Sequence, residues 1–498
     1  MRKVIDSQMK LGESYIGDIE FDLRSRDEIP KLLMGLQHIY ITKELRDKVF
    51  GMLREMIPEG IDPANGRLGM ELWKILVLGT VRLNCNWDYD KLKEIADNHK
   101  TLRRMLGHGL VDDDQPYALQ TLKDNVSLFT PEILDKVNKV VVKAGHNLVK
   151  KEEEKLAGKC DSFVVETNVH FPTDIRLLLD AVRKVITLIA VLCRLFGITD
   201  WRQSEYNKRK LKQSHRKIQK LKRSTSKDEK KQEERGLEIL EAYVDYVLLA
   251  RNYLEKASFT LEQICRSFDV CDEKIIEIKH FIEYSEILMR QLQRRVFNGE
   301  KIPHQEKIFS IFEPHTEWIS KGKAGVPQEL GLRVCVLEDQ FRFILHHEVM
   351  EKKTDDQVAV SMVEMAKEKY PELTSCSFDK GFWSPSNKKK LDDVLEDAIL
   401  PRKGRLSEAA KKEERSETFI AGRKKHSAIE SAINGLENHG LDCCPDRGID
   451  GFRRYVSLSV LARNLETLGN IIKQRALKRE RWRAKYSSNG KARYRFAA

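Results

Sequence analysis

The chain has 498 residues, of which 41% are hydrophobic, so it is too long for one ordinary domain and apolar enough to build real cores. Its net charge of +12, from 89 basic and 77 acidic residues, favours a polyanionic partner, nucleic acid before membrane. The nine cysteines include no C-x-x-C pair, which argues against a zinc ribbon and against a disulfide framework.

The N-terminus lacks the apolar core of a signal peptide, and the most apolar run, 72–83, is too short to span a bilayer. We therefore expect a soluble cytoplasmic protein that makes no membrane contact.

Residues 1–150 have helical periodicity, with predicted helices at 71–83, 88–96 and 121–126. Short helices joined by polar turns suit either a DNA-binding module or a dimerisation bundle, and periodicity does not choose between them.

A β-rich run follows at residues 161–170, with Gly158 before it and Pro172 after it. It has an acid, Asp161, at its start.

Residues 175–300 predict a helical insertion with helices at 175–196, 206–223 and 227–256. The segment 206–223 holds nine Lys or Arg and no Asp or Glu. Two long antiparallel helices with a charged tip fit this pattern. The basic stripe, which includes Lys208, Arg209 and Lys210, predicts contact with phosphates, and a solvated helical hairpin is the alternative.

From residue 307 the β pattern returns. We expect strands at 307–312, 331–338, 340–350, 373–378 and 398–400, and helices at 355–369, 386–396, 423–439 and 455–478. Thr354 is the expected N-cap of the helix at 355–369, and a charged connector spans 401–422. The basic tail contains Arg481 and Arg483, interleaved with aromatic residues.

Without the insertion, this order approximates that of a ribonuclease-H-like mixed α/β sheet. In that fold the first strand is central and the fourth lies beside it, so Asp161 and Asp379 should be close, with Glu430 on the last core helix. The expected organisation is a helical N-terminal domain (1–150), a catalytic core (151–174 and 301–445), a helical insertion (175–300), and a C-terminal helix with a basic tail (446–498).

Three carboxylates that meet in space would hold Mg²⁺ or Mn²⁺, because hard oxygen ligands suit these ions. Two such ions serve phosphodiester chemistry by activating a water and steadying the leaving oxygen. Like charges this close repel, so the metal-free site should be strained or partly protonated. Glu166 and Asp174 are rivals of Asp161, and Glu437 is a rival of Glu430.

Basic and aromatic residues near the acids predict DNA contacts. Lys380 and His426 would touch phosphate, with a solvated role as the alternative. Trp383 would stack on a displaced base, although a core position is an alternative for this residue too. The basic run before Glu430 adds Arg423, Lys424 and Lys425.

At these residues the sequence resembles bacterial insertion-sequence transposases of the DDE class. The resemblance rests on DS at 161–162 with VETNVHFPTD at 165–174, EPHTE at 313–317 with KGKAG at 321–325, DKGF at 379–382, and HSAIES at 426–431. Residues 72–106 also resemble the helical domain that precedes the catalytic core in many such enzymes.

The resemblance implies a ribonuclease-H-like core with the triad Asp161, Asp379 and Glu430, two Mg²⁺ or Mn²⁺ ions, and double-stranded DNA as partner. The DNA would be the terminal inverted repeats and a target, handled by a homodimer or larger assembly, nucleoid-associated when bound. The implied activity is strand cleavage followed by strand transfer. The alternatives are a catalytically silent DNA-binding protein derived from a transposase, and a metal-dependent nuclease without strand transfer.

Overall fold

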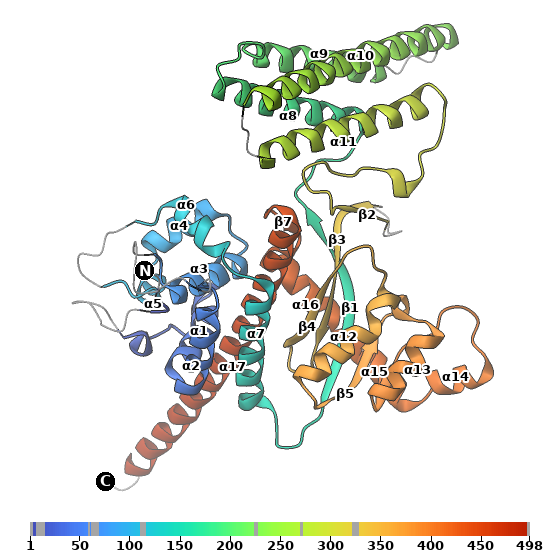
Figure 1. Ribbon diagram of the computed structural model, residues 1–498. Coiled ribbons are helices and arrows are strands. Elements are labelled where there is room, and N and C mark those ends of the chain that lie inside the picture. Colours follow the sequence, from blue (N-terminus) through green and yellow to red (C-terminus); the bar gives the residue numbers. More distant parts are fainter. Residues whose placement is uncertain are drawn as a thin grey trace. The chain divides into compact units, whose positions relative to one another are not determined.

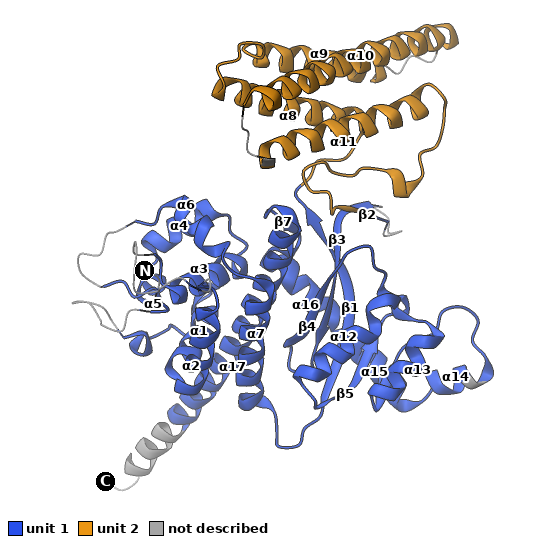
Figure 2. Cartoon of the chain, viewed as in Figure 1, with its two compact units in different colours: residues 1–168, 319–498 blue, residues 169–318 orange. Residues whose placement is uncertain are grey.

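The computed structural model describes residues 3–5, 15–57, 60, 69–109, 116–223, 228–268, 272–320 and 328–495. The chain divides into two compact units (Figure 2), residues 1–168 with 319–498, and residues 169–318. The first unit combines helices with a mixed sheet, so the predicted mixed α/β class is confirmed. No helix in the described part of the chain is long and apolar enough to cross a membrane.

The sheet has seven strands in the order β2-β3-β1-β5-β6, with β4 added at β3 and β7 at β1. β3 runs antiparallel to β1 and β4, whereas β5 runs parallel to β1 and β6. β1 therefore lies in the middle (Figure 1). The strands are β1 (Leu156–Thr167), β2 (Glu317–Ser320), β3 (Gln328–Glu338), β4 (Ile344–Met350), β5 (Leu373–Phe378), β6 (Asp397–Ile399) and β7 (Cys443–Cys444).

Two strand predictions need correction. β1 begins at Leu156, so Asp161 is near its middle and not at its start. Gly158 continues the strand because its missing side chain leaves room for Leu337 and Cys376, which would lie 3.0 and 3.2 Å from a Cβ there. The predicted strand at 307–312 is wrong, because the Ser310 hydroxyl accepts from the backbone of Glu313 at 3.0 Å and holds a local turn.

The helices α12 (Asp355–Lys369) and α13 (Pro385–Val394) match their predictions closely. The Thr354 cap is confirmed as a capping box with Gln357. The connector predicted at 401–422 is wrong, because it contains α14 (Glu408–Glu414) and most of α15 (Glu417–His426).

The single helix predicted at 423–439 is also wrong, because the chain breaks there into separate pieces. α15 ends at His426, α16 (Ile429–Leu436) follows, and a π-helical turn (Glu437–Leu441) closes the segment. Gly440 has φ 93° in that turn, which is a conformation suited to glycine.

The N-terminal helices and the sheet share one hydrophobic core with the last helix, α17 (Gly448–Arg495). α17 packs against α1, α3, α7 and β4. It is longer than the predicted 455–478, and the predicted basic tail belongs to it. The N-terminal helices are α1 (Ile29–Ile41), α2 (Lys43–Arg54), α3 (Leu72–Asn84), α4 (Tyr89–Asn98), α5 (Lys100–Met105), α6 (Leu119–Val126) and α7 (Pro131–Val149).

The second unit has its own hydrophobic core among four helices. They are α8 (Asp174–Leu195), α9 (Ser204–Lys222), α10 (Glu229–Ser267) and α11 (Asp272–Val296). The helices predicted at 175–196 and 206–223 are confirmed as α8 and α9, whereas α10 runs eleven residues beyond its predicted end at 256. The Trp201 indole N–H donates to Thr260 Oγ1 at 3.1 Å inside this core.

Helices α1 and α17 touch backbone to backbone through a pair of glycines. A Cβ on Gly469 would lie 1.7 Å from the Lys31 carbonyl oxygen, and a Cβ on Gly35 would lie 2.3 Å from the Leu465 carbonyl oxygen. Side chains at either position would therefore push the two helices apart.

We expect Gly469→Ala to lower the free energy of unfolding by about 2–4 kcal/mol, because the backbone it meets cannot move aside without cost. Urea unfolding followed by circular dichroism measures this. Gly51→Ala in α2 is the matched control, since nothing lies within 4 Å of a Cβ there. The control should be neutral or stabilising by up to about 1 kcal/mol. Equal effects of the two substitutions would contradict the close approach.

Candidate functional site

Asp161 and Asp379 lie on neighbouring strands at corresponding heights. In the parallel pairing of β1 with β5, Cys160 is opposite Phe378; Asp161 follows Cys160 within β1, and Asp379 is the first residue after β5. Glu430 lies in the first turn of α16, which packs against β1. The central strand, its parallel neighbour and the covering helix thus each direct one acid to the same region.

The pKa of Asp161 reflects its burial and the charges of the other acids. Burial, together with the charges of Asp379, Asp355 and Glu430, raises the pKa of Asp161 to about 6. The Ser162 backbone N–H, which donates to Asp161 Oδ1 at 2.8 Å, acts in the opposite direction. A half-buried carboxyl surrounded by like charges favours its proton or a cation.

The acids are near one another without forming a closed ligand set. Within the part of the chain that the structure describes, no group of three or more His, Cys, Asp or Glu side chains is placed to hold a metal ion. Asp379 and Glu430 are both solvent-exposed, so the region is open on their side.

The sequence analysis missed a fourth acid, Asp355. It is the first residue of α12, and its Oδ1 accepts a hydrogen bond from the Ser162 hydroxyl at 2.6 Å. A Cβ on Gly381 would lie 2.8 Å from Asp355 Oδ2, so this acid also borders the turn that follows Asp379. The available signal was an acid directly after the Thr354 cap, which is ordinary at a helix N-terminus and therefore does not stand out.

The rival acids occupy other places. Glu166 is exposed five residues beyond Asp161, which puts it on the opposite face of β1. Asp174 belongs to the second unit, where it pairs with Arg295 at 3.0 Å. Glu437 begins the π-helical turn after α16. Glu430, and not Glu437, is among the charges that raise the pKa of Asp161.

The predicted DNA-contacting residues near the acids differ in exposure. Lys380 is exposed, as are Arg423, Lys424 and Lys425 at the end of α15. His426 is half-buried with Nδ1 3.1 Å from Ser377 Oγ, and burial lowers its pKa while Asp379 opposes this.

Trp383 is half-buried against the main core, and the Arg402 guanidinium lies 5.1 Å from its ring centroid. This placement matches the core alternative for Trp383, with an added cation–π contact.

The remaining predicted contacts lie elsewhere. Arg209 and Lys210 are exposed on α9 in the second unit, and Lys208 pairs with Glu205 at 2.5 Å. Arg481 and Arg483 are exposed on α17. The segment 321–325, one of those that carry the family resemblance, lies outside the described residues.

A pocket of about 740 Å³ opens on the sheet face that carries Asp161, between β1, β5, β6 and α15. Lys159, Ser377 and Ala428 line it, and each lies two residues before one of the three acids. Along a strand, residues two apart share a face, so the pocket on β1 and β5 adjoins the acids. The Lys159 amino group is already paired with Glu338 at 2.6 Å.

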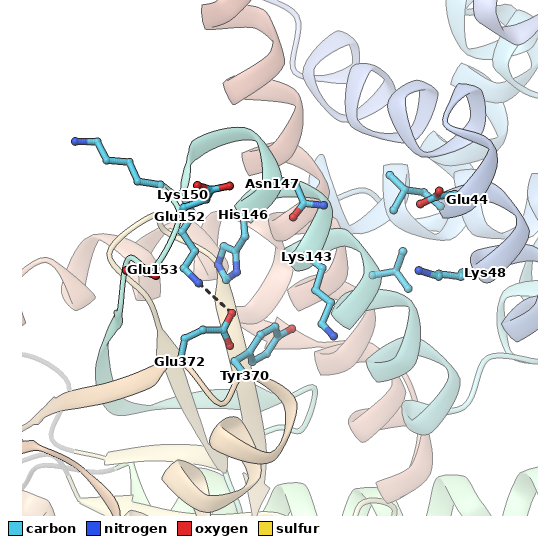
Figure 3. Close-up of a pocket in the computed structure, with 13 residues that line it drawn as sticks. Glu44, Lys48, Lys143, His146, Asn147, Lys150, Glu152, Glu153, Tyr370 and Glu372 are labelled. Atoms are coloured by element: carbon cyan, nitrogen blue, oxygen red, sulfur yellow. Dashed lines mark hydrogen bonds and ion pairs between the residues drawn. The ribbon is translucent and has the colours of Figure 1, made fainter.

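A second pocket, of about 590 Å³, lies between α2, α7 and the segment that follows α12 (Figure 3). The Tyr370 hydroxyl there is buried and has no hydrogen-bond partner among the described residues. The charges of this pocket balance, since four lysines face four glutamates, including the pair Lys150 and Glu372 at 3.0 Å. None of the predicted acids lines it, so we do not assign it to the site.

Comparison with known proteins adds no relative: no family model, no curated protein and no solved structure matches this chain.

In metal-free protein, we expect ionisation of Asp161 to lower the stability of the wild type relative to Asp161→Asn as the pH rises from about 4 to about 6. The pKa of Asp161 rises from 3.8 to about 6 on folding, so in this window the folded state binds more protons than the unfolded state. Asp161→Asn removes that cost and should stabilise the protein above pH 6, by about 1–3 kcal/mol.

Thermal melting in EDTA at several pH values measures this effect. Glu166→Gln, on the same strand but exposed, is the control and should change little. Equal stability of Asp161→Asn and wild type at pH 7.5 would contradict the raised pKa.

Proposed function

We propose that the chain is a DNA transposase of the DDE class, which binds the ends of an insertion sequence and performs metal-dependent strand cleavage and strand transfer. The observation that carries this proposal is the electrostatic cluster at Asp161. Asp379, directly after the parallel strand β5, and Glu430, on a covering helix, both act electrostatically on Asp161. Binding DNA gives no physical reason to cluster carboxylates, because each repels phosphate.

The sheet supports a ribonuclease-H-like assignment of the core, which we also propose. The five strands β4-β3-β1-β5-β6 follow the expected order, with antiparallel pairing up to β1 and parallel pairing after it. The second unit enters the chain between β1 and β3, which agrees with an insertion after the first strand.

Asp161, Asp379 and Glu430 are the residues that would hold Mg²⁺ or Mn²⁺, and two such ions would supply water activation and charge neutralisation at the scissile phosphate. Asp161 must lose its proton to serve as a ligand, so metal affinity should rise with pH through about 6. Asp355 would hold the Ser162 hydroxyl and so orient the strand beside Asp161.

Double-stranded DNA carrying inverted repeats and target sequence is the proposed partner. The exposed run Arg423, Lys424 and Lys425 lies five to seven residues before Glu430, at the end of the preceding helix, and suits the backbone flanking the scissile phosphate. Further phosphate contacts would come from α9 and α17. The protein would act in the bacterial cytoplasm, on the nucleoid, as a homodimer or larger assembly.

A silent DNA-binding protein is the second candidate, and one observation favours it. The described acids do not form a ready metal-binding group. A nuclease without strand transfer would share the site. A strand-transfer assay would distinguish it, because a nuclease would not join the cut end to a target plasmid.

We expect Asp161→Asn, Asp379→Asn and Glu430→Gln each to reduce cleavage of a labelled duplex carrying the element's ends by at least about a thousandfold, because each change removes a metal ligand. DNA binding should persist in all three. The reaction is run with Mg²⁺, with Mn²⁺ and with EDTA.

Asp393→Asn is the matched control, since this exposed acid lies on α13 away from the cluster. Metal-dependent nicking retained by any of the three variants would show that the wrong carboxylate is assigned. Wild-type binding without cleavage under every metal condition would favour the silent candidate.

Replacing Arg423, Lys424 and Lys425 together by alanine should weaken DNA binding and flatten its salt dependence. If all three contact phosphates, the slope of log K against log salt should fall by up to about 2.7. Fluorescence anisotropy across a salt series measures the slope. An unchanged slope would assign these residues to a solvated helix end.

A further inference from the structure

The helix α10 carries a row of apolar side chains that face solvent. Leu237, Leu240, Val244 and Leu248 are 61%, 36%, 42% and 50% exposed. Their spacing of three or four residues places them on one face of the helix, over about 16 Å. We call these four residues the α10 stripe.

The stripe is not needed by the core of its own unit. The opposite face of α10 already fills that core, with Ala242, Tyr243, Tyr246 and Ala250 all fully buried. Tyr246 also donates its hydroxyl hydrogen to the Ile175 carbonyl at 2.8 Å, which fixes that face inward. A helix this well packed on one side gains nothing within the unit from a second apolar side.

Beyond Leu248 the same face continues into a groove of about 620 Å³ between α10 and α11. Leu254, Phe259 and Met289 are the apolar residues of its lining, which is otherwise polar or charged, and Phe259 is 62% exposed. Arg251 and Arg290 line it together with glutamates from both helices. One part of α10 therefore offers an apolar ridge, and the part beyond it borders a groove of mixed polarity.

The charge along α10 differs between its halves. Residues 229–245 contain six acids and three bases, whereas residues 246–267 contain two acids and three bases. Glu241 lies within the span of the stripe and Arg251 lies three residues after Leu248, and both are exposed. An identical helix laid in the opposite direction would set the half with a net charge of −3 in each copy against the half with a net charge of +1 in the other.

We propose that the α10 stripe is the interface of a homodimer, in which α10 pairs antiparallel with α10 of a second copy of this chain. A two-fold axis near Tyr246 places Val244 against Leu248 of the other copy, and Arg251 against Glu241 of the other copy. Each contact then occurs twice, as an isologous interface requires. This pairing gives an interface to the homodimer of the proposed function, and it does not require metal binding at Asp161.

The test is sedimentation equilibrium of the full chain over a wide concentration range. Wild type should reach twice the chain mass of 57.9 kDa. Leu240→Glu with Leu248→Glu should remain monomeric, because it buries charge on both sides of the axis.

Ile276→Glu is the matched control, since Ile276 is 64% exposed on α11 of the same unit, and it should dimerise like wild type. Circular dichroism checks that each variant is folded. A wild type that stays monomeric at every concentration would overturn the proposal, and so would a dimer that persists in the double variant. Recruitment of a different protein by a monomeric wild type would overturn it as well.

A charge exchange tests the direction of the helices. Arg251→Glu alone, or Glu241→Arg alone, should raise the dimer dissociation constant roughly tenfold, because each puts two like-charged pairs at the interface. Combining the two substitutions should return the constant to near the wild-type value. Failure of the combined variant to recover would overturn the antiparallel pairing.

Discussion

Asp161 lies on β1, which is paired along both edges and has buried residues on both faces, such as Cys160 and Phe163. A carboxylate in that position has little water, and three further acids act on it. Ionised Asp161 is therefore costly until a proton or cation accompanies it. β5 ends directly before Asp379, α12 begins at Asp355, and α16 carries Glu430 in its first turn. Each of these elements therefore brings one acid close enough to act on Asp161. The ends of these elements thus meet at one electrostatically unfavourable position.

Much of this arrangement was predictable from local pattern. Alternating apolar residues locate β3, β4 and β5, and the Thr354 cap locates α12. The proximity of Asp161 and Asp379 followed from strand order alone, since a parallel neighbour brings the following residues to the same height. That these acids hold metal stays a prediction, because strand order sets distances between backbones and not the convergence of side chains.

The errors come from places where local and tertiary signals disagree. The break after His426 divides one predicted helix into two. The predicted connector contains helices because Ser407 caps α14 and Ser416 caps α15. Asp355 escaped notice because a first-turn acid normally serves its own helix. Its contact with Ser162 spans 193 residues, and no local pattern reports a partner that distant.

The buried side chain of Asn464 joins three elements of the first unit, the same unit that carries the acids. Its amide nitrogen donates to Asn138 Oδ1 at 2.7 Å and to the Ile344 carbonyl at 2.9 Å, while its oxygen accepts from the Ile344 N–H at 2.9 Å. One buried side chain thus joins α7, β4 and α17. Because such groups are costly to leave unpaired, the three elements cannot separate without losing all of these bonds. The N-terminal helices are therefore built into the same unit as the acids.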